Sequence, residues 1–225
     1  MTISVVIPAL DEAACVVSAV ESAAGSGVEV IVVDGGSRDE TARLARNAGA
    51  RVFVACEGQR GRARQLRLGG KKSTGDVVLF LHADTRLAVG WRDAVECVMA
   101  DPANAGGAFA LRFDERGVRE RWIEGWVAAR VAVLRLPYGD QAIFLRRQLL
   151  ERMGGVPVVP IMEDLDLVRA IKDAGELRSL ALSATTSSRR YREGGTLRTL
   201  FWHSVALLGW YFGWDRTRLA RRMGR

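Results

Sequence analysis

The sequence contains few of the residues that build disulfide-rich or zinc-dependent proteins. It has three cysteines and two histidines among 225 residues. Cys15, Cys56 and Cys97 lie far apart among apolar residues, are odd in number and lack the close spacing of a metal site. We therefore predict that all three are buried free thiols, because isolated cysteines usually behave as small hydrophobic residues.

The chain also lacks the features that divide or target a protein. No Pro/Ser-rich linker, internal repeat or low-complexity tract interrupts it, and its N-terminus enters an apolar segment without a basic and apolar leader. These absences predict one compact unit without a signal peptide, located by default in the cytoplasm. With 48% hydrophobic residues, the chain can bury a full core.

Acidic residues are outnumbered, and the formal net charge is +7 with a sequence pI of about 10.0. Nearly all of the cationic residues are arginines, which concentrate at 60–67, 189–192 and 216–225. No helix-turn-helix, zinc-finger or RNA-binding aromatic motif accompanies these clusters, so nucleic acid is not predicted as a partner. A diphosphate ligand or an anionic membrane surface explains the clusters more simply.

Apolar runs alternate with segments of helical spacing through the first half of the chain. The runs at 3–8, 29–34, 51–56 and 76–82 indicate strands, and the last is apolar between its polar ends. Alternating strands and helices imply right-handed crossovers and a parallel sheet, so we predict an α/β fold. The carboxyl ends of these strands then face one edge, where ligands bind in open α/β sheets.

Two local patterns predict where helices begin. Residues 37–40, Ser-Arg-Asp-Glu, have the form of a capping box, which predicts a helix that starts at about Arg38. Residues 163–166, Glu-Asp-Leu-Asp, carry carboxylates that free N–H groups and the positive dipole end favour at a helix N-terminus. In the second half, residues 106–113 and 140–145 are predicted as strands.

Two carboxylates stand at the predicted sheet edge. Asp84 closes the triplet His82-Ala83-Asp84 after the fourth strand, where it is placed to hold a metal ion and a phosphate. Asp34 precedes two glycines and is placed to accept a hydrogen bond from a base N–H or a ribose hydroxyl. Each has a plainer alternative, since Asp-Thr and Asp-Gly-Gly also occur in ordinary tight turns.

Four motifs, in order along the chain, resemble those of the family 2 glycosyltransferases. They are Val5–Glu12, Val33–Thr41, Gly75–Asp84 and Met162–Asp166, and the resemblance extends over residues 3–192. The similarity implies the GT-A nucleotide-diphospho-sugar transferase fold, an α/β fold with a Rossmann-like half and a mixed central sheet. The His-Ala-Asp triplet, together with Gly-Asp-Gln at 139–141, is most similar to a short bacterial branch of that family.

The resemblance implies a sugar donor, a UDP- or GDP-sugar, bound by the first half of the chain. It places a nucleotide-binding half at 1–86 and an acceptor half at 87–195, with a helical tail at 196–225. Arg62 and Arg64 would neutralise the diphosphate, although surface solvation is the alternative for either arginine. The implied donor-binding residues are Pro8, Ala9, Leu10, Glu12, Asp34, Arg62, Arg64, His82 and Asp84.

Asp84 is similar to the last carboxylate of the family's DXD motif, which implies a divalent cation held against the donor diphosphate. Mg²⁺ or Mn²⁺ suits a site made of one carboxylate and phosphate oxygens. His82 stands where many relatives have aspartate, so this chain has one negative charge fewer there. Three roles stay open for its imidazole: a metal ligand, a hydrogen bond to the sugar or ribose, or a structural contact at the strand end.

The resemblance also makes Asp164 the general base, with Glu163 beside it. Asp164 would take the proton of the acceptor hydroxyl while that oxygen attacks the anomeric carbon, and one base without a covalent nucleophile implies inversion. The alternative is that the acids of 163–166 serve only the helix start. The implied acceptor-side residues are Gly107, Gly139, Asp140 and Gln141.

Residues 200–214 are apolar and aromatic, but they fall short of the ~20 residues that a membrane-spanning helix needs. With Arg198 before them and the basic segment 216–225 after them, they suit an interfacial helix on the inner face of a membrane. Packing against the catalytic domain and a dimer contact are equally compatible alternatives. The acceptor is then either lipid-linked or a soluble small molecule.

Two other functions compete with sugar transfer. A nucleotidyltransferase would normally carry a Gly-rich loop with a lysine after its first strand, and residues 9–12, Ala-Leu-Asp-Glu, do not supply one. A catalytically silent module that binds a sugar nucleotide or a lipid surface would keep Asp34 and Asp84 but would not need Asp164. A measurement of turnover therefore separates the silent module from an enzyme.

Overall fold

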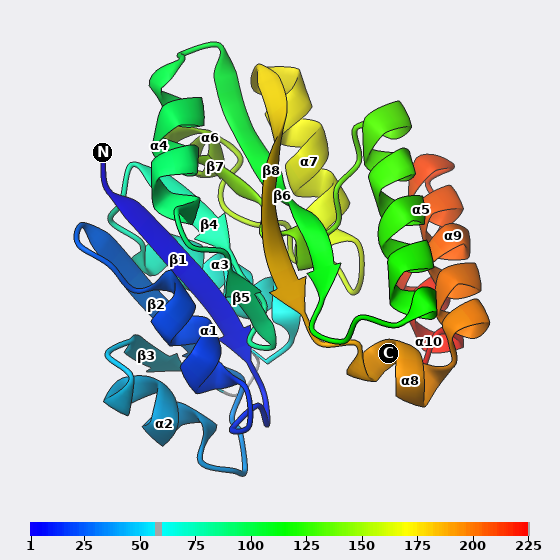
Figure 1. The fold of residues 1–225 in the computed structure, drawn as a ribbon, viewed down its shortest axis with the longest axis horizontal. Helices are drawn as coiled ribbons and strands as arrows, with labels where there is room; N and C mark the ends of the chain where they lie inside the picture. The colour runs from blue at the N-terminus through cyan, green and yellow to red at the C-terminus, as the bar shows by residue number, and fades with distance from the viewer. Residues whose placement is uncertain (57–59, 225) are drawn as a thin grey trace.

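An eight-stranded mixed sheet forms the centre of the computed structural model, which describes residues 1–56 and 60–224 (Figure 1). The strand order is β3-β2-β1-β4-β7-β6-β8-β5. The first four of these strands are parallel, whereas β7 is antiparallel to β4 and β6, and β5 is antiparallel to β8. The strands are β1 (Ile3–Ala9), β2 (Val28–Asp34), β3 (Arg51–Val54), β4 (Val77–Phe80), β5 (Thr85–Leu87), β6 (Asn104–Phe113), β7 (Phe144–Arg146) and β8 (Glu176–Thr186).

Helices cover both faces of this sheet. The core on one face includes residues of α1, α2 and α4, and the core on the other includes residues of α3, α6 and α7. In Figure 1, α5 and α9 lie next to each other at the side of the sheet. The helices are α1 (Val16–Ala23), α2 (Thr41–Asn47), α3 (Arg62–Lys72), α4 (Trp91–Ala100), α5 (Val118–Leu134), α6 (Arg147–Arg152), α7 (Glu163–Ala174), α8 (Arg189–Gly194), α9 (Thr196–Tyr211) and α10 (Arg216–Arg222), with a 3-10 turn η1 (Gly139–Gln141).

The central strands are apolar because each contributes to both cores. Val5 and Leu79 belong to the core that includes α1 and α4. Val6 and Phe80, one position further along β1 and β4, belong to the core that includes α3 and α6. Successive side chains of a strand point to opposite faces. A parallel strand covered on both faces must therefore be apolar throughout, and the fourth predicted strand is confirmed as one.

The predicted edge of the sheet is also confirmed. Strands β1, β2 and β4 are parallel, and Ala9 at the end of β1 is paired with Asp34 at the end of β2. Residues 82–84 follow β4 at the same edge, directly before β5. The three loops that were expected to carry ligand-binding groups therefore leave the sheet on one side.

The helix predicted from Arg38 begins at Thr41, so the capping-box prediction is wrong. No side chain caps this helix. Ser37 Oγ instead donates to Asp34, and Asp39 accepts hydrogen bonds from Thr41 N at 3.0 Å and from the loop after β1 at 3.0 Å. Ser37 and Asp39 of the expected cap therefore hydrogen-bond to the loop after β1 instead of capping the helix.

The prediction of three buried thiols is wrong as well. Cys56 and Cys97 are exposed, and Cys15 is half-buried. Cys97 lies in α4. Residues spaced four apart on this helix face the core, and Cys97 lies on the opposite, outer side. The buried stripe of α4 consists of Trp91, Val95 and Met99.

The strand predicted over 140–145 is shorter than expected. Residues 139–141 form the 3-10 turn η1, and strand β7 starts only at Phe144. Between them, Ala142 takes a left-handed conformation with φ of 47°, which ends the turn and redirects the chain into the sheet. This turn places Gly139 and Asp140 at the edge of a cavity rather than inside a strand.

The aromatic tail packs on the rest of the protein, which is one of the three alternatives left by the sequence. Ala206 and Trp210 of α9 and Leu219 of α10 are buried in clusters that include Ile161 and Leu165. Among residues 1–56 and 60–224, the structure contains no helix that is long and apolar enough to cross a bilayer.

Candidate active site

The loops after β1 and β4 and the start of α3 enclose a cavity of about 240 Å³ at the predicted sheet edge. We call it the donor cavity. It is lined by Pro8, Ala9, Leu10, Glu12, Gly61, Arg62, Gln65, His82, Ala83 and Asp84. Seven of the nine residues predicted to bind a donor therefore meet in one place, and Asp34 and Arg64 do not line this cavity.

Asp34 shapes the turn after β2. Its Oδ2 accepts hydrogen bonds from the backbone N–H groups of Gly36 and Ser37, both at 3.1 Å, and its Oδ1 accepts one from Ser37 Oγ. The carboxylate is buried at 2% exposure. Gly36 has a φ of 89°, and an ideal Cβ there would lie 3.2 Å from Nη2 of Arg60. A contact between Asp34 and a nucleotide remains a prediction, because the bonds seen here hold its own turn.

Gln65 is a residue of the donor cavity that sequence reasoning missed. Its Nε2 donates to the carbonyl oxygens of Ala9 and Val33, both at 2.8 Å. These bonds tie α3 to the ends of β1 and β2 inside the protein. Gln65 could have been noticed as a polar residue on the buried side of α3, one position before Leu66 and four before Gly69.

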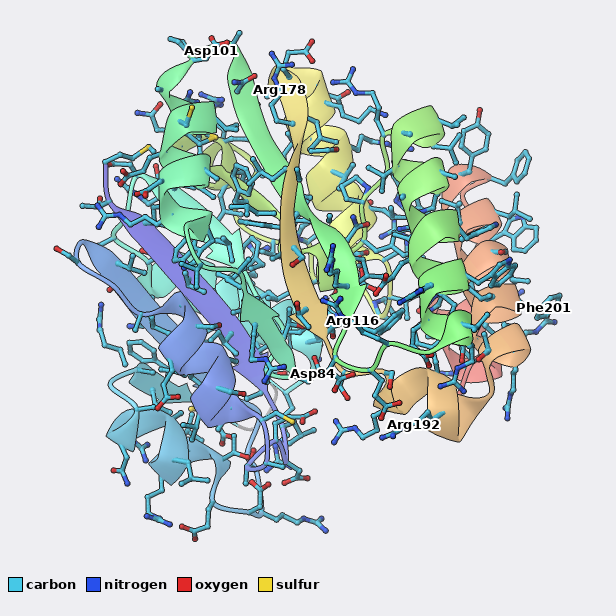
Figure 2. All side chains as sticks on the ribbon, in the orientation of Figure 1. Asp84, Asp101, Arg116, Arg178, Arg192 and Phe201 are labelled. Atoms are coloured by element: carbon cyan, nitrogen blue, oxygen red, sulfur yellow. The ribbon has the colours of Figure 1, made fainter. Side chains whose placement is uncertain are left out.

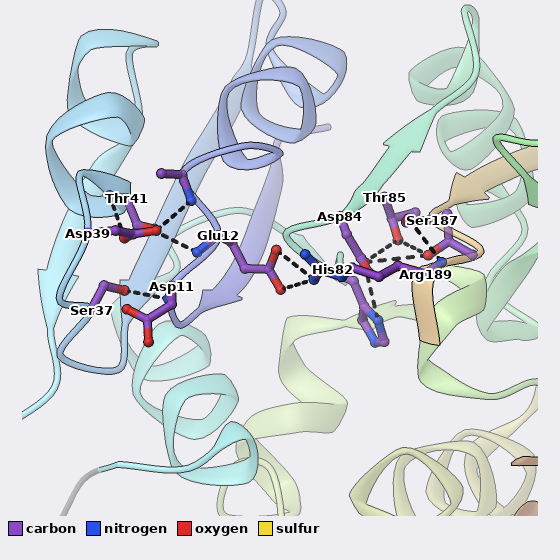
Figure 3. A network of polar contacts seen from close by, with 12 residues as sticks. Asp11, Glu12, Ser37, Asp39, Thr41, His82, Asp84, Thr85, Ser187 and Arg189 are labelled. Carbon is purple, nitrogen blue, oxygen red and sulfur yellow. Dashed lines mark hydrogen bonds and ion pairs between the residues drawn. The ribbon is translucent and has the colours of Figure 1, made fainter. Parts of the chain in front are cut away.

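Asp84 and His82 both line the donor cavity, and Figure 3 shows their side chains close together. Oδ1 of Asp84 lies 4.0 Å from Nδ1 of His82 and accepts long hydrogen bonds, 3.4 Å each, from Thr85 Oγ1 and Thr186 Oγ1. Within residues 1–56 and 60–224, no three acidic, histidine or cysteine side chains gather to form a complete metal site. One carboxylate with a neighbouring imidazole fits Mg²⁺ or Mn²⁺ only if ligand oxygens and water complete the coordination.

Arg189, far along the chain, binds Glu12 of the donor cavity. Its Nη2 donates to both carboxylate oxygens of Glu12, at 2.9 and 3.1 Å, as Figure 3 shows. Burial raises the pKa of Glu12, although Arg189 opposes this shift, and the hydrogen bond to Glu12 raises the pKa of Arg189. Arg189 is thus a cation near Asp84 that the sequence marked only as part of a basic run.

A second cavity of about 180 Å³ lies beyond the first, and Arg62 and His82 line both. We call it the inner cavity. Its wall is formed by the η1 turn, the start of α7, His203 of α9 and Met223, which follows α10. It is lined by Arg62, His82, Tyr138, Gly139, Asp140, Pro160, Ile161, Met162, Glu163, Asp164, His203 and Met223.

The acids at the start of α7 bind three different parts of the protein. Glu163 Oε1 forms an ion pair with Nε of Arg62 at 2.9 Å. Asp164 Oδ2 accepts the backbone N–H of Gly139 at 2.7 Å, and its Oδ1 accepts the N–H of Leu165 at 2.9 Å. Glu163 and Asp164 therefore face the inner cavity from one helix end, where a carboxylate has the geometry to act on a hydroxyl bound beside it.

Asp166 is turned toward the tail. Arg216 donates to Oδ2 and Oδ1 of Asp166 at 2.5 and 2.9 Å, and Nε1 of Trp210 donates to Oδ1 at 2.8 Å. The hydrogen bond to Asp166 raises the pKa of Arg216. The third acid of the motif therefore holds α9 and α10 on α7.

Gly139 is the point where the side chains of the inner cavity converge. An ideal Cβ on Gly139 would lie 2.3 Å from Arg62 Nη2, 3.2 Å from Asp164 Oδ2 and 3.3 Å from His82 Nε2. Any side chain at this position would displace at least one of them, because real Cβ atoms do not approach within 3.0 Å. The absence of a side chain here therefore lets Arg62 keep the position that it has in the site.

The remaining predicted site residues lie elsewhere. Gly107 is inside β6, where a Cβ would lie 2.5 Å from the carbonyl oxygen of Arg178. Gln141 is buried and donates to the carbonyl oxygen of Phe109 at 3.0 Å. Arg64 is exposed and donates to the carbonyl oxygen of Arg60 at 3.3 Å. Of the predicted acceptor-side residues, Gly139 and Asp140 line the inner cavity, while Gly107 and Gln141 support the fold around it.

The chain matches the model of a known protein family. The model of the family described as Glycosyl transferase family 2 matches residues 4–146. That range contains every residue of the donor cavity, whereas most residues of the inner cavity follow it.

Several solved structures have a similar fold. A mycobacterial protein is 28% identical with a TM-score of 0.57, over 83% of this chain and 65% of that one. Glucosyl-3-phosphoglycerate synthase from Mycobacterium tuberculosis, in complex with Mg²⁺ and uridine diphosphate, is 21% identical with a TM-score of 0.67, over 95% and 80%. TarS from S. aureus is 18% identical with a TM-score of 0.65, over 84% and 61%. The chain thus spans less than two thirds of the first and the third of these proteins.

Proposed function

The chain belongs to glycosyl transferase family 2, and we propose that it moves a sugar from a nucleoside diphosphate to an acceptor hydroxyl with inversion at the anomeric carbon. The observation that carries this proposal is the pair of cavities that share Arg62 and His82. One cavity has the residues expected for a nucleotide sugar, and the other presents the carboxylate of Asp164. The anomeric carbon is assigned to the place where they meet.

Asp164 acts as the general base in this proposal. Its carboxylate takes the proton of the acceptor hydroxyl while that oxygen forms a bond to the anomeric carbon. The bond between the anomeric carbon and the phosphate oxygen breaks, and the nucleoside diphosphate leaves from the opposite face. The N–H of Gly139, 2.7 Å from Oδ2, fixes the direction of the carboxylate.

The donor diphosphate is assigned to the cationic and polar groups of the donor cavity. Arg62 is placed to bind phosphate oxygens, because it lines both cavities beside the expected bond cleavage. Asp84, with His82 beside it, would hold a divalent cation against the diphosphate. Such a cation supplies positive charge that stabilises the leaving group. The similarity to a synthase crystallised with Mg²⁺ and uridine diphosphate supports both assignments.

Nucleotide binding tests this function directly. We expect UDP or GDP to raise the melting temperature of the protein, and Mn²⁺ to increase that shift. Asp84→Ala should retain the fold and lose the part of the affinity that depends on metal. Asp93→Asn, an exposed acid in α4, is the control and should behave like the unmutated protein. Equal affinity with Mn²⁺ and with a chelator would contradict the metal assignment.

Sugar transfer must also be separated from the silent binding module. If the protein is a silent module, it binds the nucleotide but releases no nucleoside diphosphate from any UDP- or GDP-sugar. We favour the enzyme because Asp164 faces a cavity and is oriented by a backbone N–H. A carboxylate that served only the helix start would need neither feature.

We also propose that the outer face of α5 and α9 touches an anionic membrane surface. Trp122, Trp126 and Val133 are spaced on one side of α5 and exposed at 56%, 40% and 79%. On α9, Phe201 is exposed and projects away from the sheet (Figure 2). Exposed arginines, Arg119 among them, accompany this aromatic face, as expected for a protein at anionic headgroups.

The membrane contact is tested without truncating the tail, because Ala206 and Trp210 belong to buried clusters. Replacing Trp122 and Trp126 together by serine should weaken sedimentation with anionic vesicles. Val89→Ser, which removes an apolar residue exposed at 98% elsewhere, is the control. Added salt should weaken binding once the Debye length falls to ~8 Å. Unchanged binding by the double variant would contradict the contact.

A further inference from the structure

We infer that Arg130 of α5 is a positioning residue for Asp164, the proposed general base. It acts through the η1 turn, whose Gly139 N–H donates to Asp164 Oδ2 at 2.7 Å. The inference rests on the proposed function, because it takes Asp164 as the base. It goes further by giving a role to a buried cation that lines neither the donor cavity nor the inner cavity.

Arg130 is a cation on the buried side of its helix. It follows Ile123 and Val127 in the buried stripe of α5 and is 7% exposed. Its Nε is a buried nitrogen that donates no hydrogen bond to any described residue. Burying a guanidinium is costly unless its N–H groups are bound, and an apolar side chain of similar length would fill the space without that cost. The contacts that Arg130 does make therefore indicate its role.

These contacts hold the η1 turn at both ends. The guanidinium carbon of Arg130 lies 3.5 Å from the centre of the ring of Tyr138, the residue before the turn. Its Nη2 donates to Oε1 of Gln141, the last residue of the turn, at 3.2 Å. The same Oε1 accepts the backbone N–H of Tyr138 at 3.2 Å. A planar guanidinium can stack on a ring and donate at its edge at the same time, so one side chain fixes both ends of the turn.

The direction of the Gly139 N–H depends on these two ends. Tyr138 and Gln141 are 8% and 3% exposed, and Nε2 of Gln141 donates to the carbonyl oxygen of Phe109 in β6 at 3.0 Å. Gly139 lies between them, so a shift of either end would turn its N–H away from Asp164. A misplacement of about 1 Å at a reacting group can lower a rate by about 10²-fold.

A purely structural role is the plainer alternative, in which Arg130 only holds α5 on the sheet. That role predicts less folded protein, and an effect that adds to the effect of any other substitution. A positioning role predicts slower turnover by protein that is folded, and an effect that disappears once the carboxylate of Asp164 is gone. A double-mutant cycle separates the two, because it measures the coupling between the two side chains.

The cycle compares the unmutated protein, Arg130→Met, Asp164→Asn and the variant with both changes. The measurement is kcat for release of UDP from UDP-glucose or of GDP from GDP-mannose, with water as the acceptor, counted per molecule that binds the nucleotide. We expect Arg130→Met to lower kcat by at least about tenfold, to leave the nucleotide Kd unchanged, and to add nothing to Asp164→Asn. Arg121→Met, which changes an exposed arginine of the same helix, is the control and should leave kcat unchanged.

Arg130→Lys separates the geometry of the side chain from its charge. The lysine keeps the positive charge, but its ammonium cannot lie flat on the Tyr138 ring while it donates to Gln141. We therefore expect this variant to be slowed as well. It replaces Arg130→Met in the cycle if the methionine variant does not fold.

The results distinguish the inference from the proposed function. If the unmutated protein releases no nucleoside diphosphate from either donor, the proposed function fails and the inference falls with it. If Asp164→Asn is slow while the folded Arg130 variants turn over at the unmutated rate, the inference alone is overturned. Additive effects in the cycle also overturn it and leave sugar transfer in place.

Discussion

Glu12 and Arg189 are 177 positions apart in the sequence, and Nη2 of Arg189 lies 2.9 and 3.1 Å from the two carboxylate oxygens of Glu12. The pair joins the loop after the first strand to the helix after the last β-strand, α8. Of the two residues, Glu12 lines the donor cavity. A residue of the donor cavity is therefore held by a contact from far along the chain.

The pH dependence of stability tests whether burial or Arg189 has the larger effect on the pKa of Glu12. Burial raises its pKa above the ordinary value of 4.5, in spite of Arg189. The stabilisation from protonated Glu12 is then fully present below that value and is lost as the pH rises through the raised pKa. Since Glu12→Gln cannot titrate, the melting temperature of the unmutated protein should fall relative to this variant as the pH rises. The opposite trend would mean that Arg189 outweighs burial.

Asp164→Asn tests the general base. The amide keeps the size of the side chain but cannot take a proton, so turnover should fall by ~10²–10⁴-fold. Nucleotide affinity should barely change, because Asp164 lines the inner cavity and not the donor cavity. The measurements are nucleoside diphosphate release and nucleotide binding.

The neighbouring acid is the control for that experiment. Glu163→Gln removes an ion pair with Arg62 but leaves the proton acceptor in place, so it should cost less turnover than Asp164→Asn. Transfer at the unmutated rate by Asp164→Asn would remove it from the mechanism. Loss of nucleotide binding together with turnover would mark Asp164 as a structural residue.

Gly139→Ala tests whether the site depends on the missing side chain. The new Cβ would lie 2.3 Å from Nη2 of Arg62, so Arg62 must leave its position between the two cavities. We expect turnover to fall by about 10²-fold, as for other small displacements of reacting groups. Gly125→Ala in α5 is the matched control, because a Cβ there meets no atom within 4 Å. It should leave turnover unchanged and add ~0.5–1 kcal/mol of stability.

Asp166→Asn tests how the tail is held. The substitution weakens two contacts with Arg216 and leaves a guanidinium that is three quarters buried without its counter-charge. The free energy of unfolding should fall by about 1–3 kcal/mol. Arg218→Ala breaks only an exposed pair with Asp215 and should cost less than about 1 kcal/mol. Equal effects in thermal or urea unfolding would show that the tail does not depend on Asp166.

The sequence predicted the parallel half of the fold well because its strands are apolar on both faces. Strands β1, β2 and β4 each have the continuous apolar run that burial on two sides requires, and their ends lie where expected. The start of α2 was misplaced because Ser37 and Asp39 accept hydrogen bonds from backbone N–H groups of the loop after β1. Local spacing cannot show such contacts, since their partners are distant in the sequence.

Only those parts of the candidate site that depend on short stretches of sequence could be predicted. Glu163 and Asp164 could be placed at a helix start from four residues, and the structure brings them to the inner cavity. Arg189 and His203 could not be assigned, because only the folded chain brings α8 to Glu12 and α9 to the inner cavity. Cys97, in contrast, was predictable from the four-residue stripe of α4 and was misjudged.

The contact between Glu12 and Arg189 also bears on the order in which the protein is made. Closing so long a loop has an entropic cost that must be met before the contact can stabilise anything. During synthesis, the first strands leave the ribosome long before Arg189 does, so they can form without the contact that Arg189 makes with Glu12. A growing chain that has completed its family-matched region therefore has every residue of the donor cavity, but its Glu12 carboxylate has no Arg189 to bind until α8 emerges.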